Sequence, residues 1–236
     1  MLSCLRAESR SGDTHYSKPP LAPVAILFYP EGMAVPPLRF ETLQGAALQP
    51  FLPALASLRI AVFRDWPYLY AGDEAYEQHY LRAYAQGVGA AVIIAFDGNT
   101  PVGAATCEPM GETHGTVSES FVSAGLNPAD YCYFGESVLL RPYRGQGAGV
   151  RFFELREAHA RRLGAARTTF CAVRRDASDP RRPADYVPLD GFWRRRGYMP
   201  LEGLSCTMTW REPGGAEEIP HRLDFWQKTL NGASPS

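Results

Sequence analysis

The sequence lacks a close pair of cysteines. Its five cysteines are scattered along 236 residues, and four of them lie in segments with the composition of strands: Cys107, Cys132, Cys171 and Cys206. An odd number of cysteines without close spacing argues against both a disulfide framework and a zinc site. We therefore expect buried thiols, no bound metal and a reducing compartment, which makes the protein cytoplasmic.

A strong net charge is also missing. The formal net charge is -1, so the chain as a whole exerts no electrostatic attraction on nucleic acid or anionic lipid. Fourteen arginines fall between Arg141 and Arg196, but no aromatic interleaving or nucleic-acid module accompanies them, and we interpret them as a solvated helix face with an anion-facing rim. No segment approaches the length of a membrane span. We expect neither nucleic acid nor a membrane among the partners.

Composition divides the chain into three regions. Small and polar residues dominate positions 9–23, so we expect a disordered extension over residues 1–34. We hypothesise that residues 1–32 are dispensable and that their deletion leaves the thermal midpoint within a few degrees. The globular domain is expected over residues 35–212. Residues 213–236 are expected to pack on that domain or trail from it, with 224–230 as a candidate docking segment, and a homodimer stays open.

The apolar periodicity predicts alternating strands and helices within the domain. We expect strands at 38–43, 90–96, 102–108, 131–140, 167–173 and 198–210, the last either continuous or interrupted at Gly203. Helices are expected at 49–63, 74–86 after the cap Asp73, 115–125, 146–163 and 189–196. Strands on both sides of the helix at 146–163 imply a βαβ unit, and hence a parallel pair. The predicted fold class is α/β, with a mixed twisted sheet and helices on both faces.

The most distinctive segment lies between the strand at 131–140 and the helix that follows. It reads Arg144-Gly145-Gln146-Gly147-Ala148-Gly149. Glycines at alternate positions let backbone N–H groups converge on a phosphate at a helix N-terminus, and Arg144 adds further donors. The dinucleotide fingerprint needs a glycine where Val150 stands, and a P-loop needs a Lys-Ser or Lys-Thr pair after Gly149. The segment therefore predicts a pyrophosphate cradle of another kind.

Two motifs together resemble a known family. Residues 136–149, Glu-Ser-Val-Leu-Leu-Arg-Pro-Tyr-Arg-Gly-Gln-Gly-Ala-Gly, and residues 191–198, Gly-Phe-Trp-Arg-Arg-Arg-Gly-Tyr, look like the GNAT superfamily of acetyl-coenzyme A-dependent N-acyltransferases. The superfamily loop Arg/Gln-x-x-Gly-x-Gly/Ala matches at Arg144, Gly147 and Gly149. The resemblance implies acetyl-coenzyme A (acetyl-CoA) as co-substrate and direct acetyl transfer to a primary amine of a small molecule or peptide.

The resemblance also implies where acetyl-CoA is held. Main-chain groups around Val138 and Leu140 would pair with the pantetheine arm as an added strand does. Backbone amides of Gly145, Gln146, Gly147, Ala148 and Gly149 would hold the pyrophosphate beside Arg144. A backbone N–H within 138–140 would stabilise the oxyanion.

Acetyl transfer to an amine needs a base, because an amine with a pKa of about 10.4 is about one part in a thousand neutral at pH 7.4. Glu136 lies two residues before Val138 on the same strand face, which makes it our candidate base, and an ion-paired glutamate is the alternative. The superfamily's usual acid position holds Trp193, whose indole N–H is no useful acid. We therefore expect Tyr186 to protonate the leaving thiolate, and Tyr198 to be a packed strand residue.

Further segments keep two interpretations each. Residues 176–188 are expected to form a loop over the acceptor or cofactor entrance, where nearby arginines either contact an anion or are solvated: Arg174, Arg175, Arg181 and Arg182. Aromatic residues between Trp66 and Tyr84 either shape the acceptor pocket or form core. Because of Trp193, an alternative function also stays open: a non-catalytic regulatory protein that binds acyl-CoA without releasing thiol.

Overall fold

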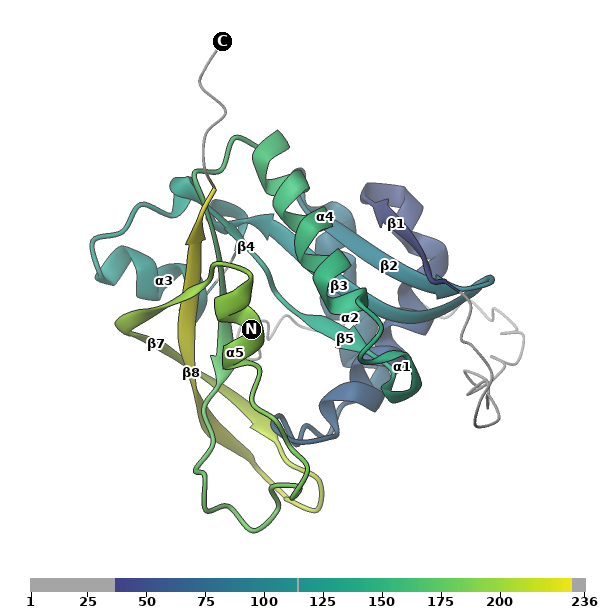
Figure 1. Cartoon of the computed structure of the whole chain (residues 1–236), viewed down its shortest axis with the longest axis vertical. Helices are drawn as coiled ribbons and strands as arrows, with labels where there is room; N and C mark the ends of the chain where they lie inside the picture. Colours follow the sequence, from purple (N-terminus) through teal and green to yellow (C-terminus); the bar gives the residue numbers. More distant parts are fainter. Residues whose placement is uncertain (1–36, 114, 231–236) are drawn as a thin grey trace, which may run out of the picture.

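The computed structural model describes residues 37–113 and 115–230 and contains one open, mostly antiparallel sheet (Figure 1). The strand order is β1-β2-β3-β4-β6-β8-β7, and β5 pairs with β3 off this path. The expected extension over residues 1–34 lies outside the described residues. The strands are β1 (Arg39–Leu43), β2 (Ala91–Asp97), β3 (Thr100–Pro109), β4 (Tyr131–Tyr133), β5 (Ser137–Leu139), β6 (Arg167–Val173), β7 (Met199–Arg211) and β8 (Glu218–Thr229).

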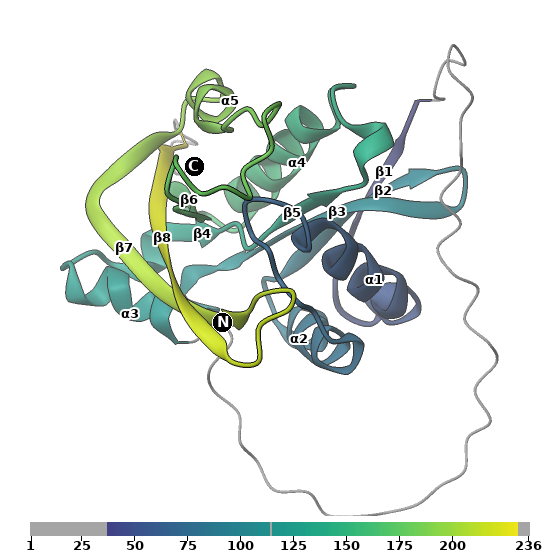
Figure 2. The same cartoon turned by 90° about the horizontal axis from the view of Figure 1, so that it is seen from below.

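Helices cover both faces of the sheet, as predicted. Figure 2 shows α4 and α5 on one side, and α1 and α2 on the other. The helices are α1 (Leu52–Phe63), α2 (Glu74–Gln86), α3 (Thr116–Ser123), α4 (Ala148–Arg162) and α5 (Asp190–Arg195), with short 3-10 segments η1 (Gly45–Phe51), η2 (Met110–Glu112), η3 (Pro128–Asp130) and η4 (Arg141–Tyr143). The parallel pair of β4 with β6 on either side of α4 confirms the predicted βαβ unit.

Local signals account for several of these elements. The Asp73 carboxylate accepts from the Tyr76 N–H at 2.9 Å and so caps α2. Pro53 lies in the first turn of α1, where a missing N–H leaves no hydrogen bond unmade. Residues 97–100 close a hairpin between β2 and β3, with Gly98 at φ 57°.

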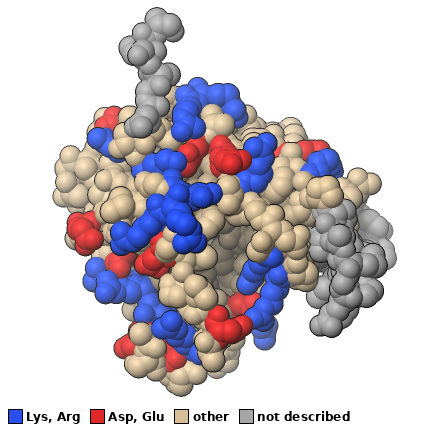
Figure 3. All heavy atoms as spheres, viewed as in Figure 1, with Lys and Arg blue, Asp and Glu red and all other residues tan. Residues whose placement is uncertain are grey.

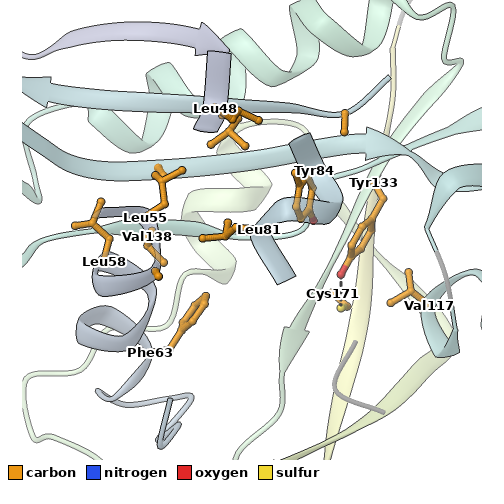
Figure 4. Packing of buried hydrophobic residues seen from close by; sticks show 14 of the residues in the cluster. Leu48, Leu55, Leu58, Phe63, Leu81, Tyr84, Val117, Tyr133, Val138 and Cys171 are labelled. Carbon is orange, nitrogen blue, oxygen red and sulfur yellow. Dashed lines mark hydrogen bonds between the residues drawn. The ribbon is translucent and has the colours of Figure 1, made fainter. Parts of the chain in front are cut away.

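Two hydrophobic clusters lie on opposite faces of the sheet. Leu55 and Leu58 from α1 and Leu81 from α2 pack with Val138 in the first cluster (Figure 4). The second cluster lies under α4 and includes Phe152, Phe153 and Tyr198. Every residue of β2 is buried, because both faces of that strand are covered.

One helical stretch corrects the expectation about membrane-length segments. Gly45–Phe63 has 19 residues and a mean hydropathy of 1.5, which is long and apolar enough to cross a membrane by length and composition. One third of that window (33%) is buried inside the protein. Leu48, Leu55 and Leu58 belong to the first core cluster, and a core helix of a globular domain meets the same criteria.

The predicted strand at 131–140 is divided in two. β4 pairs with β6, whereas β5 pairs with β3. The Phe134 N–H still donates to the Thr169 carbonyl at 2.8 Å, and beyond it the chain leaves β6. β5 and β6 therefore separate, and this separation opens the cleft described below.

The expected role of residues 213–236 is corrected as well. Their described part contains β8, which pairs with both β6 and β7 inside the sheet. Leu223, Phe225 and Trp226 on this strand are all buried. β8 is therefore an interior strand of the domain, and the candidate docking segment 224–230 is taken up within one chain.

Candidate active site

A cleft of about 940 Å³ opens where β5 separates from β6. The loop before α4, the first turn of α4, helix α5 and the loop after β6 complete its walls. Figure 3 shows Lys and Arg side chains gathered around a hollow on this face of the molecule. Arg144, Arg174 and Arg182 line the cleft. A volume of this size, with basic residues at its margin, suits a large anionic ligand.

The glycine loop presents unpaired amides to this cleft. Gly145 and Gly147 have φ values of 79° and 85°, a left-handed conformation that favours glycine. No side chain caps α4, and the first main-chain bond of the helix joins the Arg151 N–H to the Gly147 carbonyl at 3.1 Å. The preceding amides, including those of Ala148 and Gly149, have no partner within the helix. This end of α4 is therefore a site for an anion such as a pyrophosphate.

The other side chains of the loop fold back on its own backbone. The Arg144 Nε donates to the Leu139 carbonyl at 3.1 Å, and the Gln146 Nε2 donates to the Pro142 carbonyl at 3.1 Å. Ala148 is buried under the loop. An added Cβ at Gly149 would stand 3.4 Å from the Phe192 ring, so α5 packs closely over this turn. The loop is thus fixed from both sides.

The pairing of β5 reverses the expected roles of Val138 and Leu140. The Leu140 N–H donates to the Val102 carbonyl at 3.0 Å, and Val138 lies opposite Ala104 two positions earlier. Because hydrogen-bonding direction alternates along an antiparallel strand, the main-chain groups of both residues face β3. Those of Ser137 and Leu139 face away from β3, and both residues line the cleft. A ligand arm would pair with Ser137 and Leu139 instead.

Glu136 stands in the gap between β4 and β5. Its Oε1 forms an ion pair with Arg59 of α1, and its Oε2 accepts from the Tyr80 hydroxyl of α2 at 2.9 Å. Arg59 also pairs with Glu77, which is fully buried. Burial opposes the charge of Arg59, but the neighbouring Glu136 and Glu77 carboxylates outweigh it and raise the pKa of Arg59. The carboxylate of Glu136 is therefore held in one position by two helices.

The hydroxyl groups of Tyr80, Tyr84 and Thr106 form hydrogen bonds around Glu136. The Tyr80 and Tyr84 hydroxyls are 3.1 Å apart, and the Glu136 N–H donates to the Thr106 Oγ1 at 3.1 Å. Burial, followed by the nearby Glu136 charge, raises the pKa of Tyr80 well above its ordinary value. Tyr80 therefore stays a hydrogen-bond donor at neutral pH, which fixes the direction of its bond to Glu136.

A second, smaller cavity of about 90 Å³ adjoins the cleft at Glu136. Tyr68, Gly135, Glu136 and Cys171 line both spaces, so the two meet at these residues. The remaining walls of the small cavity are largely aromatic and include Tyr70, Tyr76, Tyr133 and Trp210. Figure 4 shows the Tyr133 hydroxyl bonded to Cys171, and this 3.2 Å contact stands at the junction. The aromatic region around Tyr68 to Tyr80 therefore lines a pocket.

A sequence profile now decides the family. The profile of the acetyltransferase (GNAT) family matches residues 56–183, which is more than half of the chain. The chain belongs to this family. It is accordingly an acetyl-CoA-dependent N-acetyltransferase, and it takes the acyl group from acyl-CoA.

Solved structures share the GNAT fold at low sequence identity. The ribosomal-protein-alanine N-acetyltransferase of Brucella melitensis has a TM-score of 0.55 at 15% identity, covering 82% of this chain and 100% of that one. The protein yncA of Salmonella typhimurium, solved with its cofactor acetyl-CoA, has a TM-score of 0.53 at 14% identity, covering 85% of this chain and 98% of that one. An acetyltransferase from Streptococcus agalactiae has a TM-score of 0.51 at 14% identity, covering 82% of this chain and 98% of that one. Among curated proteins, none matches the sequence significantly.

The GNAT cleft contains Tyr186 and Trp193, whereas Tyr198 lies outside it. Tyr186 is half-buried, with its ring edge against Trp66 at 6.0 Å between centroids. Burial, followed by the charge of Asp190, raises the pKa of Tyr186. Trp193 packs against Phe170 and Trp226. Tyr198 is fully buried, as predicted, and its hydroxyl bonds to Thr168 Oγ1 at 2.8 Å.

The four arginines near the loop after β6 divide into two kinds. Arg175 donates to the Pro67 carbonyl and to Glu212, both at 2.6 Å, and Arg181 also pairs with Glu212. These two hold the loop against neighbouring segments. Arg174, which pairs with Asp224 at 2.9 Å, and Arg182 line the cleft and remain candidates for contact with an anion.

Within residues 37–113 and 115–230, no group of three or more His, Cys, Asp or Glu side chains could hold a metal ion.

Sequence reasoning missed Arg59 as a member of the site, and it missed the bond of Tyr80 to Glu136, although Tyr80 is among the aromatic residues considered for the acceptor pocket. Arg59 is the single charged residue in the run Leu52–Phe63, which is otherwise composed of apolar residues and one serine. A lone charge in a strongly apolar helix is a signal that a buried partner exists. Tyr80 carries no such signal, because its contact with Glu136 joins residues 56 positions apart.

Proposed function

We propose that the protein transfers the acetyl group of acetyl-CoA directly to a primary amine, with Glu136 as general base. The observation that carries this proposal is the position of the Glu136 carboxylate, at the junction of the large cleft and the small aromatic cavity. An amine in the cavity would meet an acetyl group in the cleft at this junction, and a base is useful only there. The acceptor is then a small molecule or a peptide terminus or side chain that can enter the cavity.

The residues of the cleft fit acetyl-CoA, which supplies the acetyl group as a thioester. The uncapped N-terminus of α4, with left-handed Gly145 and Gly147, would receive the pyrophosphate. The outward-facing groups of Ser137 and Leu139 would pair with the pantetheine arm. The Leu139 N–H would then stabilise the negative charge that develops on the carbonyl oxygen during attack.

Proton transfer would involve two side chains. Glu136 would accept the proton that the amine loses, using lone pairs of its carboxylate that Arg59 and Tyr80 leave open. Tyr186 would return a proton to the departing sulfur. The position of Tyr186 in the wall of the cleft supports this assignment, because a general acid has to reach the departing sulfur.

The pH profile of Glu136→Gln tests the base. We expect kcat/KM to fall by about a hundredfold near pH 7 and to recover toward the wild-type value at high pH, where more amine is already neutral. Glu154→Gln is the matched control, because Glu154 is an exposed residue on α4 that pairs with Arg151. A Glu136→Gln profile parallel to that of the wild type would remove Glu136 from this role.

Tyr186→Phe tests the acid separately. Loss of a general acid should lower kcat by about a hundredfold and leave acetyl-CoA binding, measured by calorimetry, intact. Retained turnover would count against Tyr186. The alternative that Trp193 left open, a regulatory protein that binds acyl-CoA without turnover, is set aside because the chain belongs to an acetyltransferase family.

A further inference from the structure

The charged groups of the small cavity lie where it meets the cleft. Of the side chains that line it in the described structure, only Arg59 and Glu136 are charged. Arg59 pairs with both Glu136 and the buried Glu77, so these two carboxylates share one ion-pair partner. The buried Arg156 lies on the cleft side, where its Nη1 donates to the Glu136 carbonyl at 3.2 Å. An ammonium ion in the small cavity would give the Glu136 carboxylate a second ion-pair partner.

The charge of Arg59 is already shared by two carboxylates. Its guanidinium lies 4.2 Å from the centre of the Tyr80 ring and 5.1 Å from that of Phe63, in addition to its two ion pairs. A ligand carboxylate in the cavity would therefore meet the Glu136 carboxylate without gaining a vacant cation. The electrostatics of the cavity favour a cation and oppose an anion.

The walls suit a cation on an apolar body. Five tyrosines line the space together with Trp210: Tyr68, Tyr70, Tyr76, Tyr80 and Tyr133. Aromatic faces attract ammonium groups and also pack against hydrocarbon. Val117 and Leu223, both buried, close the cavity with apolar surface.

The size of the cavity limits what can be enclosed. Benzene occupies an engineered cavity of about 150 Å³, whereas this one measures about 90 Å³. The enclosed part of a ligand is then a short aliphatic chain of about four or five carbons. A chain that carries a carboxylate next to its amine brings an anion to the mouth at Glu136.

We propose that the acceptor is a short aliphatic monoamine without a carboxylate, bound as an ammonium ion beside Glu136 in the tyrosine-lined cavity. This inference rests on the proposed function and narrows its acceptor from any primary amine to this class. A free amino acid is excluded by charge. A peptide is disfavoured because its polar backbone would have to enter the same apolar space.

Thiol release with acetyl-CoA and three acceptors tests the inference: 3-methylbutylamine, leucine and Nα-acetyl-lysine amide. Leucine is 3-methylbutylamine with an added carboxylate, and the lysine derivative represents a peptide side chain. We expect kcat/KM for leucine to be about a hundredfold lower than for 3-methylbutylamine. We expect kcat/KM for the lysine derivative to be lower than for 3-methylbutylamine by about tenfold or more. In Glu136→Gln the gap between 3-methylbutylamine and leucine should shrink to less than about tenfold, whereas Glu154→Gln should keep it.

The outcomes separate the two proposals. If leucine or the lysine derivative reacts as fast as 3-methylbutylamine, the acceptor class is wrong and the acetyltransferase function stands. If no acceptor releases thiol from a folded protein that binds acetyl-CoA in calorimetry, the proposed transfer fails and the acceptor class fails with it. The wild-type comparison alone decides the class, so the test does not depend on the folding of Glu136→Gln.

Discussion

Gly135 lies where the main chain passes closest to the hydroxyl groups behind Glu136. A Cβ on this residue would stand 2.6 Å from the Thr106 Oγ1 and closer still to the Tyr84 hydroxyl. Tyr84 contacts Tyr80, which in turn bonds to Glu136. The absence of a side chain at this position is therefore a condition for the position of the carboxylate.

Replacement of Gly135 by alanine should affect both stability and activity. We expect the free energy of unfolding to fall by about 1–3 kcal/mol from overpacking, and kcat/KM for the amine to fall by about tenfold or more because Glu136 shifts. Urea unfolding and steady-state kinetics measure the two effects. Gly111→Ala is the control, since nothing lies within 4 Å of a Cβ there. Equal behaviour of the two variants would contradict the packing argument.

Glu108 gives the folded protein a specific pH dependence. This residue is 8% exposed, and burial raises its pKa from 4.5 to about 7, against a hydrogen bond from Thr113 that lowers it. Between pH 4.5 and about 7, the folded state therefore keeps the Glu108 carboxyl protonated, whereas the unfolded chain releases this proton. Because the folded state binds more protons in this window, the free energy of unfolding decreases as pH rises, by about 3 kcal/mol in total.

Glu108→Gln should remove that dependence, because an amide keeps the acceptor for Thr113 without the charge. We expect the variant to exceed the wild type in free energy of unfolding by about 3 kcal/mol at pH 8, and by less than about 1 kcal/mol at pH 5. Urea titrations at the two pH values measure the difference, with Glu154→Gln as a surface control. A difference that is the same at both pH values would rule out a raised pKa as its cause.

Single residues also mark how far sequence reasoning reaches. Asp73 caps its helix as predicted, because a cap depends on residues three positions apart. The contact of Tyr80 with Glu136 depends on how α2 crosses β5, and no local pattern encodes that crossing. Glu136 was placed at the centre of the site from the motif alone, whereas the Arg59 ion pair that holds it came only from the fold.

At the scale of elements, the loop after β6 is fastened to the segment before α2 by one side chain. Arg175 is 11% exposed at its side chain and joins Glu212 of the β7–β8 connection to the Pro67 and Tyr68 carbonyls. Tyr68 lines the junction of the two cavities. Arg175 therefore sets the position of one wall of the small cavity through a loop that is distant in sequence.

Arg175→Met should loosen this arrangement. Removal of one partner from a largely buried pair should lower the free energy of unfolding by about 3 kcal/mol, and KM for the amine should rise because Tyr68 is released. Arg222→Met is the control, because Arg222 is 57% exposed at its side chain and its pair with Asp224 contributes about 0.5 kcal/mol or less. Thermal unfolding and amine kinetics measure both. Similar losses in the two variants would mean that the Arg175 contacts do not set the loop.

The prediction of one strand at 131–140 was wrong, because strand pairing and not hydrophobic periodicity decides where that strand ends. Residues 131–140 have one continuous strand pattern, yet the chain changes partner from β6 to β3 after Phe134. The same change determines which carbonyls and N–H groups of β5 face the cleft, so the roles expected for Val138 and Leu140 pass to Ser137 and Leu139. Sequence patterns report which side chains are buried, and they do not report the direction of backbone hydrogen bonds.

At the scale of the whole molecule, β8 joins the edge strand β7 to the rest of the sheet. It lies between β6, which borders the large cleft, and β7, which carries Trp210 of the small cavity. The turn signal Pro213-Gly214-Gly215 before it is visible in the sequence. The segment after that turn alternates weakly and is rich in charge, so its place inside the sheet became evident only from its partners.

Truncation tests whether this strand belongs to the folding unit. Four large apolar side chains in β8 and directly after it are each at most 7% exposed: Leu223, Phe225, Trp226 and Leu230. At about 1.5–3 kcal/mol each they contribute about 6–12 kcal/mol, which is comparable to the whole stability of about 5–15 kcal/mol of a typical domain. A chain that ends at Gly215 would lose these groups and leave two open strand edges.

We expect the chain that ends at Gly215 to show no cooperative thermal transition and to aggregate in size-exclusion chromatography, whereas a chain that ends at Leu230 should melt within a few degrees of the full chain. A chain ending at Gly215 that melts like the full chain would place the domain boundary at residue 212, where the sequence alone first put it.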